Sequence, residues 1–291
     1  MVGSCVDRSV IITGAGQGLG RSHALEFARH GAKLVLNDAG TAVHGVAEEI
    51  RAAGGTVVVS TGDIADWHYA AELVHTAVDA FGQLDTLVNN AGINRDRMLA
   101  TMSEQDWDEV LRVDLKGHFA PLRHAAAYWR ERAKSGGSIA ARIVNTSSGA
   151  GLLGSVGQGN YAAAKAGIAV LTQIAAVELG RYGVQVNAIA PSARTPMTES
   201  VFAEMMAKPA DGFDAMDPAN VAPLVVWLGS ARSVAVTGRV FEVSGGDVAL
   251  ADGWRYGEPV AKRDRWQVDE LDAVVAELLE RAGPPAAVYG A

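Results

Sequence analysis

The chain alternates short, continuously apolar runs with longer amphipathic segments. Apolar runs of β-branched residues bounded by loops are typical of strands buried on both faces, as in parallel sheets. This alternation predicts an α/β fold in which a doubly wound parallel sheet of about seven strands has helices on both faces. The predicted strands are Ser9–Thr13, Lys33–Asn37, Thr56–Ser60, Asp85–Asn89, Ile143–Thr146, Val184–Ile189 and Val240–Val243. The predicted helices are Gly20–His30, Val43–Ala53, Trp67–Phe81, Glu104–Lys134 and Tyr161–Arg181.

The last part of the chain departs from this alternation. Residues 1–248 form one predicted domain, and residues 249–291 form a C-terminal extension. The extension contains a helical pattern with an apolar stripe, which we expect to pack on the same subunit or on a neighbouring one. Residues 198–214, rich in Ala, Met and Phe, are expected to form a lid over an apolar substrate. The stripe consists of Val268, Leu271, Val275, Leu278 and Leu279.

Composition and charge narrow the classes of function. The chain has 291 residues, 49% hydrophobic and 20% charged, which is enough apolar surface for one large domain. Its 25 basic and 33 acidic residues give a net charge of −8, which disfavours a nucleic-acid partner. The single cysteine, Cys5, cannot form an internal disulfide and is expected to be buried or idle. The histidines show no metal-ligand spacing, so no metal is predicted.

The pattern also carries no export or membrane signal. Met1–Arg8 lacks a long apolar stretch behind a basic start. No run approaches the roughly 18 uncharged apolar residues that a membrane helix needs. We therefore expect a cytoplasmic protein without a membrane partner.

A glycine-rich loop joins the first predicted strand to the first predicted helix. It reads Thr13-Gly14-Ala15-Gly16-Gln17-Gly18-Leu19-Gly20. Glycines let the backbone turn sharply and approach a pyrophosphate, whose charge then faces the positive end of the helix. A merely flexible loop is the alternative, but the position between strand and helix favours a dinucleotide and a Rossmann-type sheet. The predicted cofactor contacts in this loop are Gly14, Gln17, Gly18, Leu19 and Gly20.

Acidic and amide residues follow the next strands. Asp38 lies 20 positions after Gly18, where a carboxylate accepts hydrogen bonds from the adenosine ribose and repels the 2′-phosphate of NADP. The alternative is that Asp38 only caps the following turn, a common use of aspartate. Because Gln17 adds no basic charge, NAD is the predicted cofactor. Asp63 follows the third strand and is expected either to bind adenine or to cap the next helix. Asn89-Asn90-Ala91-Gly92 suits a tight bend beside a flat cofactor, or simply a turn.

Tyr161 and Lys165 lie four residues apart on one face of a predicted helix. An unperturbed tyrosine has a pKa of about 10, too high for a base near neutrality. The lysine ammonium and the positive nicotinamide ring are expected to lower that pKa, so that the phenolate takes the alcohol proton as hydride leaves. Ser148, 13 residues before Tyr161, can donate to the substrate oxygen. A tyrosine–lysine pair or a loop serine is common at a surface, but their fixed order with the glycine loop predicts an alcohol dehydrogenase.

These motifs resemble the short-chain dehydrogenase/reductase family. The resemblance runs from about Ser9 to Asp247 and includes Thr-Gly-x-x-x-Gly-x-Gly, Asn-Asn-Ala-Gly, a serine and Tyr-x-x-x-Lys in order. It implies that Tyr161 is the acid/base, that Lys165 binds the nicotinamide ribose and that Ser148 orients the substrate. The family is usually tetrameric and packs its two longest helices into four-helix bundles, so a homotetramer or homodimer is expected. The remaining predicted cofactor contacts are Asp63, Ile64, Asn90, Ala91, Gly92, Tyr161, Lys165, Pro191 and Thr195.

Two departures narrow the resemblance. The family commonly has an asparagine on the long helix that anchors a water leading to the lysine, and here this fourth catalytic position is Asp114. We expect activity to survive this change. The usual Pro-Gly after the sixth strand is Pro191-Ser192, followed by a shortened loop. The (3R)-hydroxyacyl-CoA dehydrogenase part of peroxisomal multifunctional enzymes and related actinobacterial lipid- and steroid-catabolic dehydrogenases look similar. The shared stretches include Asn37-Asp38, Asn94–Arg97, Asp106–Asp108, Gly157–Tyr161 and Val221–Val225.

The narrower resemblance implies NAD-dependent oxidation of a 3-hydroxyacyl-CoA thioester or a steroid-like alcohol. The extension offers basic side chains for coenzyme A phosphates, although interleaved acidic residues favour a solvated face. An NADPH-dependent ketoreductase is an alternative that Asp38 disfavours. A catalytically silent NAD-binding sensor is another, which the intact Tyr161 and Lys165 disfavour. The basic residues are Arg255, Lys262, Arg263 and Arg265.

Overall fold

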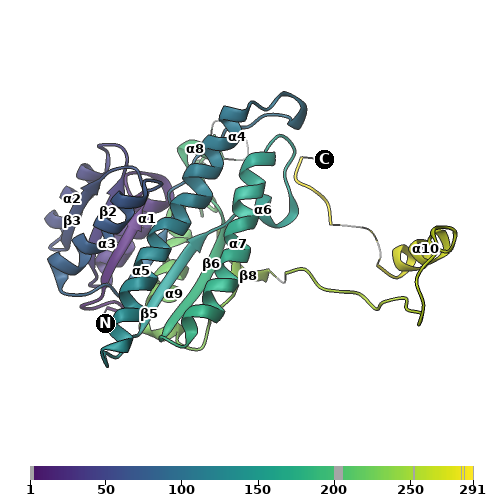
Figure 1. Ribbon diagram of the computed structural model, residues 1–291. Helices are drawn as coiled ribbons and strands as arrows, with labels where there is room; N and C mark the ends of the chain where they lie inside the picture. The colour runs from purple at the N-terminus through teal and green to yellow at the C-terminus, as the bar shows by residue number, and fades with distance from the viewer. Residues whose placement is uncertain (1–2, 200–205, 252, 283, 285, 291) are drawn as a thin grey trace.

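One twisted sheet forms the centre of the molecule. The computed structural model describes residues 3–199, 206–251, 253–282, 284 and 286–290. Within these residues eight strands are ordered β3-β2-β1-β4-β5-β6-β7-β8 (Figure 1). The order reverses between β1 and β4, and in such sheets dinucleotides bind beside that point, at the carboxyl ends of the strands. The strands are β1 Ser9–Thr13, β2 Lys33–Asp38, β3 Thr56–Thr61, β4 Thr86–Asn89, β5 Ala141–Thr146, β6 Val184–Ser192, β7 Val240–Ser244 and β8 Asp247–Ala251.

Helices cover both faces of the sheet, as the alternation of strands and helices predicts. Side chains along β1 alternate between two cores: Val10 and Ile12 belong to one cluster, and Ile11 belongs to the other. The first cluster is covered by α1 Gly18–Arg29, α2 Val43–Ala52 and α9 Ala222–Gly229. The second is covered by α3 Trp67–Phe81, α5 Gly117–Lys134 and α7 Gly159–Gly180 (Figure 1). The central strands β1, β2, β4 and β5 are therefore buried on both faces, which explains their continuous apolar runs.

The long helix predicted over 104–134 is divided in three. It consists of α4 Glu104–Val110, a π-helical segment η2 Leu111–Lys116, and α5. Single π-helical turns inside α-helices often occur at functional sites. Here the wider turn contains Asp114, whose side chain is fully buried. The other short helices are η1 Leu99–Thr101, α6 Gly149–Leu153, α8 Pro196–Glu199, η3 Pro218–Asn220 and η4 Ala231–Ser233.

The structure confirms the seven predicted strands and adds an eighth. β8 pairs with β7 in an antiparallel hairpin, whereas β1–β7 pair in parallel. The turn between them contains Gly245 at φ +53, a left-handed conformation that glycine adopts without strain. β8 crosses the boundary predicted at residues 248/249. Its exposed side chains explain why the apolar pattern did not reveal it.

Beyond β8, the chain forms an arm that stands away from the body. Residues 253–282 carry η5 Val268–Glu270 and α10 Leu271–Ala282, and Figure 1 shows them projecting from the end of the sheet. None of the residues of α10 is buried, and its apolar stripe is partly exposed, with Val275 at 49% and Leu279 at 66%. The predicted apolar stripe is therefore not covered within this subunit.

One described helix, α7, is long and apolar enough to pass a composition test for a membrane span. It carries Lys165 and Glu178, and it packs along β6 and the rest of the second core. Its inward-facing residues Ala175, Ala176 and Leu179 belong to the second core, as expected of a helix that packs on a sheet.

Candidate active site

The glycine loop lies between β1 and α1, at the carboxyl end of the sheet. Gly14 and Gly18 have φ values of +64 and +52, a region that L side chains rarely adopt. A Cβ on Gly20 would lie 2.0 Å from the carbonyl oxygen of Gly14. A Cβ on Gly18 would lie 3.2 Å from Cγ2 of Thr195, so Thr195 borders the loop. The loop therefore packs tightly on itself at the start of a twelve-residue helix, whose positive N-terminus suits a phosphate.

The turn after β4 is tied to the same loop. Asn90 donates from its backbone to Oγ1 of Thr13 at 2.9 Å, and from its side-chain amide to the carbonyl oxygens of Thr13 and Gly14. Ala91 also donates to Oγ1 of Thr13, at 3.1 Å. These bonds hold the predicted contacts at Asn90 and Ala91 against the glycine loop. The asparagine turn is therefore a structural brace as well as a candidate cofactor wall.

Asp38 ends β2 and reaches the glycine loop. Its Oδ2 accepts from the backbone amide of Gly16 at 2.9 Å, and its Oδ1 accepts from Gly40 at 2.9 Å. The second bond is the turn-capping role considered from sequence, but the first places the carboxylate beside the loop. Gln17 is the exposed residue preceding α1, and its side chain makes no capping bond there. Because Gln17 is uncharged, it does not offset the negative charge of Asp38.

Asp63 and Ile64 follow β3. Asp63 does not cap α3, because Asp66 is the N-cap and accepts from the amide of Tyr69. That alternative is wrong: Asp66 stands one residue before the helix, whereas Asp63 stands in the loop. Asp63 instead accepts from the amide of Ala65 at 2.9 Å and pairs with Arg112 at 2.5 Å. Burial opposes its charge, but these two partners hold the pKa of Asp63 below its usual value. Ile64 is 4% exposed and lies in the second core.

The predicted catalytic lysine lies in a buried ion pair. Lys165 Nζ is 3.2 Å from Oδ2 of Asp114, and the two side chains are 3% and 0% exposed. Lys165 also donates to the carbonyl oxygen of Thr146 at 3.1 Å and lies 5.3 Å from the ring centroid of Tyr161. Oδ1 of Asp114 accepts from the amide of Ile93 at 2.7 Å. The structure thus brings Tyr161, Lys165 and Asp114 together.

Burial and charge act in opposite directions on this pair. Burial alone would lower the pKa of Lys165, but Asp114 and Tyr161 raise it above its ordinary value. Burial raises the pKa of Asp114, and the ammonium of Lys165 with the Ile93 amide opposes that rise. Gly92 makes room for the pair, since a Cβ there would lie 3.0 Å from Oδ2 of Asp114. The glycine of the Asn-Asn-Ala-Gly turn is therefore required by the packing of the Asp114 side chain.

The two serines after β5 have different roles. Ser148 is the N-cap of α6, where its Oγ accepts from the amide of Ala150 at 3.2 Å, and it is partly exposed. Ser147 is buried and donates to the carbonyl oxygen of Lys165 at 2.8 Å. Ser148 is therefore available to a substrate, and Ser147 fixes the backbone of α7 at the lysine.

His118, which lies four residues after Asp114, also belongs to the site and was not predicted from the sequence. It is fully buried, and its Nε2 accepts from the amide of Thr146 at 3.3 Å. Burial, followed by the charge of Lys165, holds the pKa of His118 well below its usual value. The ring is therefore neutral and supports the strand end that binds Lys165. Its spacing of four from Asp114 on a helix was the available signal.

Other predicted residues lie at the edges of the site. Leu19 packs against the first core, and Pro191 lies in β6 opposite Val243. The predicted lid includes residues 200–205, which lie outside the described residues. Asp214, at the far end of that segment, pairs with Arg194. Of the basic residues on the arm, Lys262 pairs with Glu270 and lies over the ring of Trp266.

Neither metal nor thiol chemistry is favoured by the described side chains. Among the described residues, no three His, Cys, Asp or Glu side chains are grouped to hold a metal ion. Cys5 is buried in the first core, and burial raises its pKa to about 11. Its thiol is therefore protonated near neutrality and unreactive.

Comparison with known proteins identifies the family of this chain. Residues 8–206 match the model of the short chain dehydrogenase family. The chain belongs to the short-chain dehydrogenase/reductase family. The sequence resemblance and fold class are thereby confirmed, and the protein is an oxidoreductase that uses a nicotinamide cofactor and a small-molecule substrate.

Several relatives belong to a narrower group. The chain is 51% identical over 82% of its length to "Hydroxyacyl-CoA dehydrogenase ChsB1" of Mycobacterium tuberculosis, 78% of which is covered. It is 41% identical over 82% of its length to mouse "Peroxisomal multifunctional enzyme type 2", but it covers only 32% of that protein. A crystal structure of a short chain dehydrogenase from Mycobacterium avium is 57% identical, with a TM-score of 0.93 and coverage of 99% of this chain and 100% of that one. That alignment includes the arm.

Proposed function

We propose that the protein is an NAD-dependent dehydrogenase of apolar secondary alcohols, with 3-hydroxyacyl-CoA thioesters as the first candidates and steroid-like alcohols as the second. The observation that carries this is the buried pair of Lys165 and Asp114 beneath Tyr161, at the carboxyl end of the sheet and next to the glycine loop. The names of the relatives support the acyl-CoA substrate class.

The glycine loop, Asp38 and the Asn90 turn fit a dinucleotide. Gly14 and Gly18 allow the left-handed turns of the loop, and Gly20 lets α1 begin in contact with the Gly14 carbonyl, so that the loop stands at the N-terminus of a helix. When bound, the nicotinamide ring accepts the hydride that leaves the alcohol carbon. Tyr161 takes the hydroxyl proton of the substrate, and Ser148 donates a hydrogen bond to the same oxygen. Lys165, 5.3 Å from the tyrosine ring centroid, stabilises the negative charge that forms on the phenol oxygen.

Asp38 supports NAD over NADP. Its carboxylate already faces the glycine loop through the amide of Gly16, so a 2′-phosphate there would meet a like charge. We expect wild-type kcat/KM to be higher with NAD. Asp38→Asn should lower the ratio of kcat/KM with NAD to kcat/KM with NADP by about tenfold, because it removes the repulsion between the carboxylate and the 2′-phosphate. Preference of the wild type for NADP would overturn this assignment and favour the ketoreductase.

The decisive experiment is a spectrophotometric assay of NAD reduction. The panel consists of 3-hydroxyacyl-CoA thioesters, hydroxysteroids and simple secondary alcohols, and the matched control is Tyr161→Phe, which removes only the hydroxyl. Turnover of a thioester or steroid that is lost in Tyr161→Phe supports the proposal. NAD binding without turnover of any alcohol would contradict it and favour the sensor.

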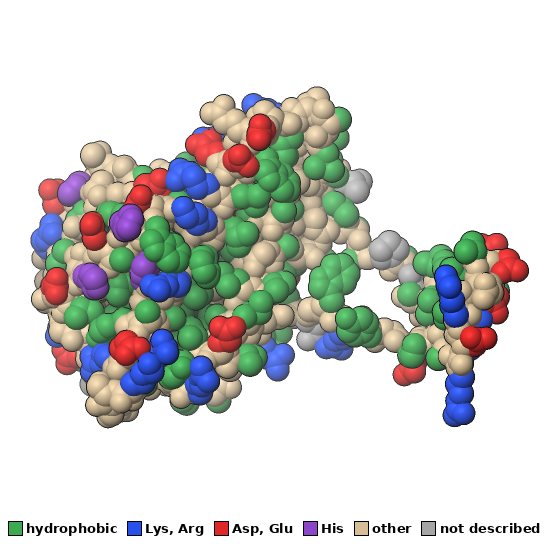
Figure 2. All heavy atoms as spheres, in the orientation of Figure 1, with side chains coloured by type: hydrophobic (Ala, Val, Ile, Leu, Met, Phe, Trp, Pro, Cys, Tyr) green, Lys and Arg blue, Asp and Glu red, His purple; other side chains and the backbone are tan. Residues whose placement is uncertain are grey.

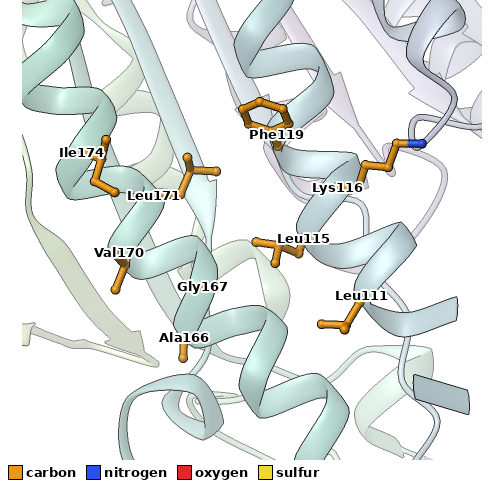
Figure 3. Close-up of a pocket in the computed structure, with 9 residues that line it drawn as sticks. All are labelled: Leu111, Leu115, Lys116, Phe119, Ala166, Gly167, Val170, Leu171 and Ile174. Carbon is orange, nitrogen blue, oxygen red and sulfur yellow. The ribbon is translucent and has the colours of Figure 1, made fainter. Parts of the chain in front are cut away.

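We also propose a homo-oligomer formed through the outer faces of α7 and of the adjacent η2–α5 segment. A groove of about 700 Å³ runs between η2–α5 and α7, and Figure 3 shows its side chains projecting from both elements. Phe119, Val170 and Ile174 in it are 41–51% exposed, and Figure 2 shows hydrophobic side chains gathered over this face. The groove is separate from the side chain of Lys165, which is buried against Asp114 and the carbonyl oxygen of Thr146. Exposed apolar surface of this kind marks protein interfaces.

A charge placed in this face tests the assembly. Ile174→Glu should shift the molar mass measured by size-exclusion chromatography with light scattering to that of a smaller species. Val234→Glu, at an exposed apolar residue outside the groove, is the matched control. An unchanged mass for Ile174→Glu would refute this interface. The uncovered stripe of α10 supports packing of the arm on a neighbouring subunit as well.

A further inference from the structure

The C-terminal tail returns to the loop that separates the catalytic residues. After α10 the described residues 286–290 lie beside α6 (Figure 1). Tyr289 forms a parallel bridge with Ser155. Val156 donates to the carbonyl oxygen of Tyr289 at 2.9 Å, and the amide of Tyr289 donates to the carbonyl oxygen of Gly154 at 3.3 Å. The tail is therefore bonded to the segment that joins Ser148 to Tyr161, which we call the substrate loop, residues 149–160.

The Tyr289 side chain lies at the catalytic end of this loop. A Cβ on Gly149 would lie 2.9 Å from Oη of Tyr289 and 3.1 Å from its Cε2. Gly149 directly follows Ser148, the predicted donor to the substrate oxygen. The tyrosine ring is thus packed on the backbone of Gly149, next to Ser148. Because it remains 45% exposed, part of the ring is free to contact a ligand.

A second segment holds the other end of the substrate loop. Arg97 bridges Gln158 in parallel, and its amide donates to the carbonyl oxygen of Gly157 at 2.7 Å. Leu99 lies against Gly159, since a Cβ there would be 2.5 Å from its Cδ2. The loop is therefore held on both sides by backbone pairing, and both partners bring apolar side chains.

Apolar side chains on the loop and its two partners are left open. Their exposed fractions lie between 41% and 76%. Neighbouring exposed apolar side chains next to catalytic residues are typical of a surface that a ligand covers. They are Met98, Leu99, Leu153, Val156, Val288 and Tyr289.

We propose that Tyr289 is a specificity-determining residue: the C-terminal tail forms one wall of the substrate site, and its ring contacts the acyl chain or ring system of an apolar alcohol beyond the reacting carbon. This inference rests on the proposed function for the class of substrate. It assigns a role in substrate choice to a residue 128 positions after Tyr161 and outside the family motifs.

The test compares long and short substrates in matched variants of the full chain. Tyr289→Ala should raise KM about tenfold for the longest thioester or the steroid that the wild type oxidises, because a partly buried aromatic contact is lost. KM for a short secondary alcohol, kcat and the Kd of NAD should change less than about twofold. Tyr289→Phe should resemble the wild type, since the ring makes the contact. Tyr256→Ala, at a fully exposed tyrosine on the arm, is the control.

Gly149→Ala provides an independent variant. Its methyl group would displace the Tyr289 ring, so KM for the long substrate should rise in the wild-type background but not further in Tyr289→Ala. Equal losses on long and short substrates, or no change in Tyr289→Ala, would overturn the inference. If the wild type oxidises a steroid but no thioester, the acyl-CoA proposal fails, and the same variants still test the tail on the steroid.

Discussion

Asp114→Asn tests the most unusual feature of the candidate site, the buried carboxylate beside Lys165. At an effective dielectric constant of about 20, opposite unit charges 3.2 Å apart attract by about 5 kcal/mol. Removing one partner of a buried pair typically costs about 3–5 kcal/mol, because the other charge stays buried without compensation. An asparagine oxygen still accepts from the Ile93 amide, so we expect a loss of about 3 kcal/mol in the free energy of unfolding.

The same change should alter the dependence of activity on pH. In the wild type, Asp114 offsets burial and raises the pKa of Lys165. The stability that Lys165 gains is therefore present below its ordinary pKa and is lost as pH rises through its raised folded value. Without the carboxylate, burial dominates and the pKa of Lys165 falls. The alkaline loss of kcat/KM should then begin at a lower pH than in the wild type.

Two assays check this prediction. Urea unfolding near neutral pH measures the stability loss without any substrate, and a pH profile of kcat/KM with saturating NAD measures the alkaline limb. Asp108→Asn, the same substitution at an exposed position on α4, is the control. An Asp114→Asn protein with wild-type stability and an unmoved alkaline limb would show that Lys165 does not depend on this carboxylate.

Two further predictions concern residues away from the reacting atoms. Burial lowers the pKa of His23 to about 3. Since the unfolded chain binds this proton below the ordinary pKa of about 6.5, stability is lost as pH falls from there towards 3, by about 2–3 kcal/mol at pH 4.5. Neither ring nitrogen of His23 has a hydrogen-bond partner, so His23→Leu should remove this acid sensitivity. Urea titrations at pH 4.5 and 7 measure the free energy of unfolding of both proteins. An equal loss of stability between the two pH values in both proteins would contradict the prediction. Gly20→Ala should weaken NAD binding and lower the free energy of unfolding by about 1–3 kcal/mol, because its methyl group would lie 2.0 Å from the Gly14 carbonyl oxygen. A fluorescence titration measures the Kd of NAD. A Kd equal to that of the wild type would count against a close approach of the cofactor to the loop.

The arrangement of the strands and most of the helices could be predicted from the sequence, because each depends on a local repeat of apolar residues. The apolar runs of β1 and β2 predict buried strands, because helices cover both faces of these strands. β8 was not predicted, because its residues are mainly exposed and it is defined by pairing with β7. The π-helical turn at Asp114 also escaped prediction, since its backbone bonds differ from those of an α-helix while its sequence pattern does not.

For the site, the sequence determined the residue types and their order. Tyr161 and Lys165 lie one turn apart on a helix, and the glycine loop follows a strand, so local geometry alone relates them. Only the tertiary structure decided which distant groups meet. It gave Asp63 an ion pair with Arg112 rather than a helix cap, placed Asp38 against Gly16, and joined Asp114 to Lys165.

The tail shows the same limit most clearly. Nothing local to Tyr289 indicates that it bridges Ser155, because the contact depends on the path of the whole arm back to the body. The sequence by itself therefore determined the fold class and predicted the glycine loop and the Tyr161–Lys165 pair, whose geometry is set within one strand–turn–helix unit or one helical turn. The tertiary structure alone decided the charge partner of the lysine and the wall beside Ser148, because contacts between distant segments depend on chain packing that no local pattern records.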